Sequence, residues 1–276
     1  MVVKGKRLSE VSPFFYELAL EKEIVKRSIK NKLYDKAIAK EIAAAPLPNL
    51  VYAEHSDLIK RAKGVDPQTQ YNKLVNIQIA SSKINKLVIH PGETFSFWTT
   101  VGHATKRKGY KEGRIIQGTK MIKGTGGGLC NLSNSINKLV LHSPLEITEF
   151  HKHSDALAPD EHGRVPLSAG TSVCYNSVDY RFKNTTDQDF QLLLWVENEQ
   201  LFGEIRSERP IEYRYEIFEK DHHFAKEGDK YYRISKIYRN TIDKKTNEVV
   251  DTQLIWDNHS EVMFDYDLIP KESIRE

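Results

Sequence analysis

The run Gly124–Asn131, with the sequence GTGGGLCN, constrains the fold more than any other stretch of the chain. Three consecutive glycines lose much conformational entropy on folding, so they indicate unusual backbone dihedrals or the close approach of another group. Residues 129–142, which begin inside this run, have the apolar spacing of an amphipathic helix. The run therefore predicts a flexible glycine loop that delivers Cys130 to the first turn of a helix.

Composition narrows the class of protein. A chain of 276 residues, 39% hydrophobic and 29% charged, is long enough to bury a substantial core. Its net charge of +3 is too small to favour nucleic acid as a partner. No apolar run is long enough for a transmembrane helix, and no long apolar run follows the basic N-terminus, so we expect a cytoplasmic protein. Two cysteines do not make a disulfide framework, although a single disulfide stays open.

The N-terminal segment reads as a helix over Ser12–Ala45, with a capping serine followed by proline. We expect this helix to pack on the core through an apolar stripe, formed by Phe14, Leu18, Val25, Ile29 and Leu33. The alternative is peripheral contact with an anionic membrane through its basic residues, which are Lys22, Lys26, Arg27, Lys30 and Lys32.

The remaining pattern predicts an α+β fold, in which an N-terminal helix lies on a mixed α/β core with antiparallel strands and a C-terminal β-rich extension. A second helix is expected over residues 71–84. Strands are expected over 49–52, 87–89, 114–116, 146–150, 172–175, 179–182, 190–196 and 201–205, and later over 213–218, 231–242 and 249–256. The expected divisions are 1–48 for the helical segment, 49–207 for the core and 208–276 for the extension.

Cys130 is the candidate nucleophile of a cysteine-dependent hydrolase or acyl transferase. A helix start lowers the pKa of a thiol, and free backbone N–H groups of Gly126, Gly127 and Gly128 can stabilise an oxyanion. A histidine must then act as base, and His153 is preferred over His151. A carboxylate would orient that histidine, with Asp155 and Asp179 as candidates. We expect Cys130 and His153 to lie within interaction distance.

Two other interpretations stay open for the same residues. Cys130, His151 and His153 could ligate zinc, although their spacing matches no common zinc motif. Otherwise no cofactor is expected. The plainer interpretation is that these residues are packed and hydrogen-bonded at a corner of the fold, and that Cys174 is a packing residue in a strand.

A binding role is the main alternative to catalysis. The glycine turn could form a ligand pocket, with side chains of Asn131, Tyr110 and Arg114 contacting a small-molecule or peptide substrate. This would make the chain a non-catalytic binding or accessory protein.

Several motifs, in order, resemble the VanW family. They are His90–Phe97 (HPGETFSF), Gly109-Tyr110, Gly126–Cys130 (GGGLC), His151–Ser154 (HKHS) and Asp179–Thr186 (DYRFKNTT). The resemblance implies a bacterial protein associated with glycopeptide resistance or cell-wall metabolism, and a cell-wall precursor as a ligand. The family commonly has glutamine after the cysteine, whereas this chain has Asn131, whose amide reaches one carbon less far.

Overall fold

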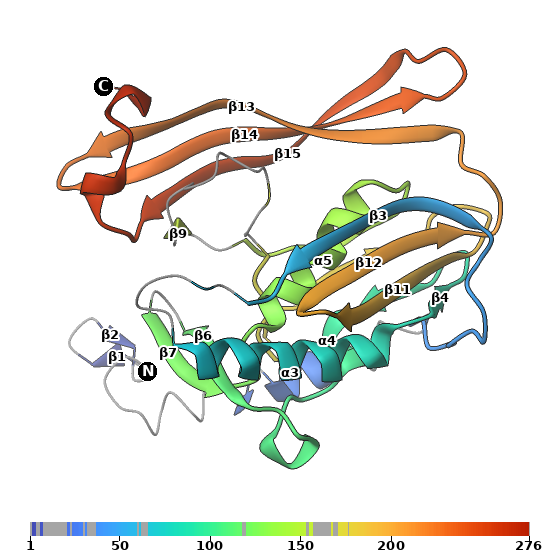
Figure 1. Ribbon diagram of the computed structural model, residues 1–276, viewed down its shortest axis with the longest axis horizontal. Coiled ribbons are helices and arrows are strands. Elements are labelled where there is room, and N and C mark those ends of the chain that lie inside the picture. Colours follow the sequence, from blue (N-terminus) through green and yellow to red (C-terminus); the bar gives the residue numbers. More distant parts are fainter. Residues whose placement is uncertain are drawn as a thin grey trace.

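The computed structural model describes residues 2–3, 6–7, 21–22, 24–29, 31, 37–59, 61, 66–117, 120–152, 155–156, 167, 171–175 and 177–275. Within them, helices combine with several mostly antiparallel sheets, which confirms the predicted α+β class. A core sheet and a longer C-terminal sheet are the largest (Figure 1). No helix in these ranges has both the length and the hydropathy needed to cross a membrane.

The core sheet is antiparallel, with strand order β3-β12-β11-β4. Its strands are β3 (Asn49–Asp57), β12 (Gln200–Ser207), β11 (Phe190–Glu197) and β4 (Leu87–Ile89). All four strands were expected, but β3 runs five residues further than predicted because it pairs with β12 along most of its length.

Two helices, α3 (Pro67–Ile84) and α5 (Leu129–Leu141), supply most of the apolar side chains that cover this sheet. The α3 helix begins earlier than predicted because the Asp66 carboxylate caps it by accepting the Gln68 N–H at 3.0 Å, with Pro67 in the first helical position. The α5 helix is amphipathic, as predicted, and it packs on β3 and β12. Its apolar side chains share one core cluster with those of β11 and β12, which includes Leu132, Ile136, Leu139, Val140, Leu192, Leu194, Leu201 and Ile205.

Smaller elements surround the helices. The strands β5 (Thr94–Ser96), β10 (Arg181–Lys183) and β8 (Glu146–Glu149) form a sheet in that order, and β5 leads into α4 (Phe97–Val101). The hairpin of β6 (Glu112–Gln117) and β7 (Lys120–Thr125) precedes α5, after the short helix η1 (Lys106–Lys108).

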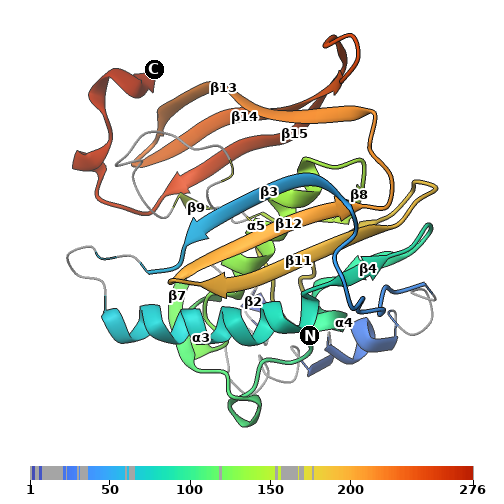
Figure 2. The ribbon, with the colours of Figure 1, turned by 45° about the vertical axis from the view of Figure 1, so that its right-hand side comes forward.

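The C-terminal extension is a three-stranded antiparallel sheet with short additions, and its three long strands cover the ranges in which strands were expected. Its long strands are β13 (Tyr213–Glu227), β14 (Lys230–Asp243) and β15 (Val249–Val262). The short strands β9 (Asp155–Ala156) and β16 (Ile274–Arg275) extend its edges in parallel. Figure 2 shows this sheet on the opposite side of the core sheet from α3. The apolar cluster of Leu141, Leu167, Ile237 and Trp256 joins it to α5.

The N-terminal helix is shorter than predicted. Residues 21–22, 24–29 and 31 are helical, but residues 37–45 are not. Ile38 and Ile42 instead form single β-bridges with Thr94 and Leu87, and these tertiary hydrogen bonds override the local helical pattern. Ser12, Phe14, Leu18, Lys30, Lys32 and Leu33 lie outside the described residues.

The two described residues of the predicted apolar stripe, Val25 and Ile29, do not attach this helix to the core. Val25 and Ile29 are 57% and 53% exposed, so their assignment to a buried face is wrong. Arg27 and Asn31 make the contacts instead, through hydrogen bonds to Glu149 and Arg181. The helix therefore does dock on its own core, but through polar side chains.

Candidate functional site: the glycine turn and Cys130

The backbone conformation and the close packing of the glycine turn (Gly126–Gly128) require glycine at these positions. Gly126 and Gly128 have φ values of +87° and +98°, a region that side chains disfavour. A Cβ atom on Gly127 would lie 2.5 Å from the backbone of Gly113 in β6. A Cβ atom on Gly128 would lie 2.3 Å from the Cγ of Lys73 in α3. The predicted unusual dihedrals and close approach are confirmed, and the group that approaches the turn is the protein itself.

Asn76 in α3 holds the turn in place. This fully buried side chain donates from Nδ2 to the carbonyl oxygens of Gly127 (2.9 Å) and Lys111 (3.0 Å). Its Oδ1 accepts the Lys111 N–H at 2.7 Å, and Lys111 in turn accepts the Gly126 N–H at 3.0 Å. Sequence reasoning missed Asn76, although a polar residue on the buried side of an amphipathic helix is a recognisable signal for such a role.

Cys130 lies in the first turn of α5, as predicted, but its environment differs from the expected one. Its Sγ donates to the carbonyl oxygen of Val173 at 3.6 Å. Burial raises the pKa of the Cys130 thiol, and this outweighs the favourable contact with its own backbone N–H. The expected lowering of this pKa is therefore wrong. Removal of the thiolate from water destabilises it by more free energy than the helix start contributes in its favour.

The side chains proposed to contact a substrate occupy different environments. Tyr110 is 1% exposed in the core, where burial raises its pKa to about 12. Asn131 has a buried Oδ1 that finds no hydrogen-bond partner among the described residues. Arg114 is exposed on β6. The structure thus does not gather these three residues into one set of contacts with Cys130.

The predicted histidines and acids are only partly described. His153 and the side chain of Asp155 lie outside the described residues, so the expected contact between Cys130 and His153 stays a prediction. His151 is exposed and its Nε2 lies 3.1 Å from Oε1 of Glu149. No group of three potential metal ligands occurs in the described part of the chain, which leaves out His153, and zinc stays an untested alternative.

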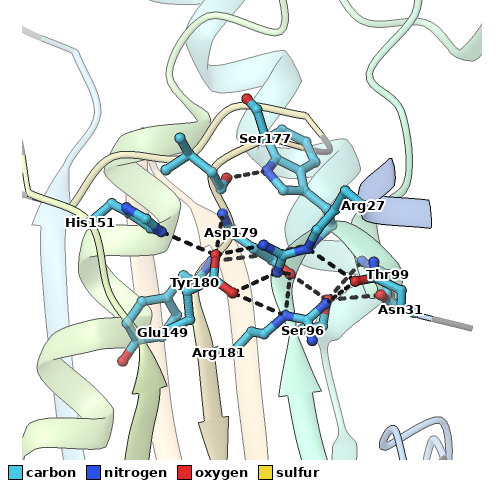
Figure 3. A network of polar contacts seen from close by, with 12 residues as sticks. Arg27, Asn31, Ser96, Thr99, Glu149, His151, Ser177, Asp179, Tyr180 and Arg181 are labelled. Carbon is cyan, nitrogen blue, oxygen red and sulfur yellow. Dashed lines mark hydrogen bonds and ion pairs between the residues drawn. The ribbon is translucent and has the colours of Figure 1, made fainter. Parts of the chain in front are cut away.

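Asp179, the other predicted orienting acid, is the centre of a buried polar cluster (Figure 3). It accepts hydrogen bonds from Ser96 Oγ (2.6 Å) and Arg181 Nε (2.8 Å). Two backbone N–H groups, of Trp98 and Tyr180, also donate to it, each at 3.0 Å. These contacts join β5, α4 and β10, and none of the contacts known for Asp179 within the described ranges involves a histidine.

Glu149 and Arg27 complete this Asp179 cluster. Arg27 donates to both carboxylate oxygens of Glu149, at 3.0 and 2.6 Å, and also lies 3.5 Å from Asp179. Burial alone would raise the pKa of Glu149, but the hydrogen bonds and charge of Arg27, with help from His151, lower it overall. The sequence offered no signal for this pairing of an N-terminal helix with β8.

Fold and site together define an α+β protein in which one core holds a glycine turn, a cysteine at a helix start and a buried acid–arginine cluster. The family model described as "VanW like protein" matches residues 72–206, so this part of the chain is similar to the VanW family. That range runs from α3 to β12 and includes the glycine turn, Cys130 and Asp179. Arg27 lies outside it.

Two curated proteins are similar to the chain. The vancomycin B-type resistance protein VanW of Enterococcus faecalis (strain ATCC 700802 / V583) is 28% identical over 226 residues, which cover 82% of each protein. The uncharacterized protein YoaR of Bacillus subtilis (strain 168) is 33% identical over 113 residues, covering 41% of this chain and 36% of YoaR. No solved structure matches the chain significantly.

Proposed function

We propose that this protein contributes to resistance against glycopeptide antibiotics, through cell-wall metabolism, as a non-catalytic binding or accessory protein. Support for the resistance role comes from the similarity to the E. faecalis resistance protein, which extends over 82% of both chains. The cell-wall precursor expected from the family resemblance is the corresponding ligand class.

The environment of Cys130 carries the non-catalytic part of this proposal. A cysteine nucleophile must be present as thiolate, but this thiol has a raised pKa and donates a hydrogen bond to the Val173 carbonyl. The glycine turn, which would have to supply the oxyanion donors, is packed against Gly113 and Lys73. Both features suit a structural cysteine better than a reactive one.

A cysteine-dependent hydrolase or acyl transferase is the second candidate. The position of Cys130 in the first turn of α5 favours it, since a nucleophile at a helix start lies beside unpaired backbone N–H groups. His153 would then be the base, and its placement is the missing element of this mechanism.

Complementation separates the two candidates. The gene would be deleted in a glycopeptide-resistant host that carries it, and the minimal inhibitory concentration of vancomycin would be measured. We expect deletion to lower this concentration and both the wild type and Cys130→Ala to restore it. Cys130→Ser is a second variant, because it keeps a polar atom that can donate to Val173.

The outcomes are distinguishable when folding is checked by near-UV circular dichroism. Unchanged vancomycin susceptibility on deletion contradicts the resistance role. If the wild type restores vancomycin resistance but neither folded Cys130 variant does, the non-catalytic role is contradicted and the enzyme is favoured.

A further inference from the structure

The two cysteines of the chain lie close together although 44 positions separate them in sequence. Cys130 Sγ donates to the carbonyl oxygen of Val173, and Cys174 follows directly. Since a carbonyl oxygen lies about 3 Å from the next Cα across a trans peptide, the Cys130 sulfur is within about 6.5 Å of the Cys174 Cα. The charge of Cys174 also acts on the Cys130 thiol, which is consistent with this proximity.

A tight turn, rather than the predicted strand, holds Cys174 in this position. The Cys174 N–H donates to Val178 O at 2.8 Å, and the Val178 N–H donates back to Cys174 O at 2.9 Å. Trp98 Nε1 also donates to Val178 O at 2.9 Å. Tyr175 stacks on His103 at 4.1 Å between ring centroids and meets Trp98 edge-on. The turn is therefore anchored by contacts with Trp98 and His103.

The two thiols differ in access to reagents. Cys174 is exposed, so the prediction that it is a packing residue is wrong, whereas Cys130 is half-buried. Both are free thiols in this structure. An exposed thiol beside a protected one is the arrangement in which a reagent enters at the first and the second resolves it.

We propose that Cys130 and Cys174 are a redox modification site, which a small-molecule disulfide such as oxidised glutathione converts into an intramolecular disulfide. The Cys174 thiolate attacks one sulfur of oxidised glutathione, which forms a mixed disulfide and releases one glutathione. Cys130 then loses its proton and attacks the Cys174 sulfur, which releases the second glutathione. Two protein thiols are oxidised, and one glutathione disulfide is reduced to two thiols.

The disulfide would tie the turn at residues 174–178 to the start of α5. Other contacts already link these regions, because Thr171 Oγ1 donates to Asn134 Oδ1 of α5 at 3.1 Å. Oxidation would therefore restrain the turn that carries Cys174, and reductant would release it.

The test treats the full-length protein with oxidised glutathione, blocks the remaining thiols with N-ethylmaleimide and measures the intact mass. Wild type is expected to lose two hydrogens, bind no glutathione and take up no maleimide. Cys130→Ser should retain one glutathione on Cys174. Cys174→Ser, a change at an exposed position, should keep Cys130 free for far longer.

Three outcomes would overturn the proposal. In the first, the wild type keeps glutathione on Cys174 while Cys130 stays free. In the second, oxidation produces only disulfide-linked dimers. In the third, Cys174→Ser reacts with oxidised glutathione as fast as the wild type does. Circular dichroism confirms that the variants are folded, and dithiothreitol should restore both thiols in wild type.

Discussion

Arg27 in the N-terminal helix pairs with Glu149 at the end of β8, with its Nη1 and Nη2 atoms within 3.0 Å of the carboxylate. The two side chains are only 14% and 19% exposed, and 122 positions separate the residues in sequence. The pair connects a segment outside the matched family range to the buried Asp179 cluster.

Removal of Arg27 should destabilise the protein strongly. Arg27→Ala leaves the carboxylates of Glu149 and Asp179 without one of their cationic partners in a mostly buried site, so we expect a loss of about 3 kcal/mol in the free energy of unfolding. Urea denaturation measures this loss. Lys22→Ala is the matched control, because Lys22 is exposed on the same helix and its change should cost less than about 0.5 kcal/mol. Equal effects of the two variants would show that the pair does not anchor the helix.

The same cluster should make stability depend on acidic pH. Glu149 has a lowered pKa in the folded protein, so its ionised form contributes stability at pH values above the ordinary range of a glutamate. That contribution is lost as pH falls through the folded pKa. The Glu149→Gln variant should lose less stability than the wild type as pH falls. Urea denaturation midpoints of the two proteins, measured between about pH 3 and pH 6, test this. Parallel pH profiles for the two proteins would refute this.

His90 should stabilise the protein in the opposite pH window. A hydrogen bond to Asp189 raises the His90 pKa against the effect of burial, and Glu41 adds to it. Protonated His90 therefore contributes fully below about pH 6.5, and the contribution disappears as pH rises through the raised pKa. The stability difference between wild type and His90→Gln should be largest near pH 5.5 and shrink by pH 8.5. A pH-independent difference would contradict this assignment.

Gly127 should tolerate alanine much less well than Gly228 does. The added Cβ of Gly127→Ala would meet the Gly113 backbone at 2.5 Å, and backbone atoms cannot rotate away. We expect a loss of about 3 kcal/mol or failure to fold. Gly228 has a φ of +63° but open space around its Cβ position, so Gly228→Ala should cost only about 1 kcal/mol of backbone strain. Thermal denaturation compares the two, and similar melting temperatures would count against the close contact.

The two thiols should differ in their alkylation rates. At pH 7 iodoacetamide should modify Cys174 at least about 10-fold faster than Cys130, because the latter is shielded and its pKa is raised. Cys130→Ser and Cys174→Ser each leave one thiol, whose modification is followed by mass spectrometry. In urea the two rates should converge. Rapid alkylation of native Cys130 at pH 6–7 would instead support its role as a nucleophile.

The sequence predictions were correct where neighbouring residues decide the conformation, and wrong where contacts between distant residues decide it. The α5 helix and the strand β4 were placed correctly, because an apolar period and flanking turn residues lie within the segment itself. Residues 37–45 were wrongly assigned to a helix, because β-bridges of Ile38 and Ile42 to distant strands decide their conformation. The pKa of Cys130 was misjudged for a similar reason, since it depends on what buries the thiol.

The sequence by itself determined the α+β class, the resemblance to the VanW family and a glycine turn that leads Cys130 into a helix, because composition, motif order and apolar periodicity are properties of the chain alone. Only the tertiary structure decided that Gly127 packs on Gly113, that Asn76 secures the turn and that Arg27 meets Glu149. It also brought Cys130 beside the Cys174 turn. Each of these contacts joins residues far apart in sequence, and their energies depend on burial and distance, which arise only when the elements pack together.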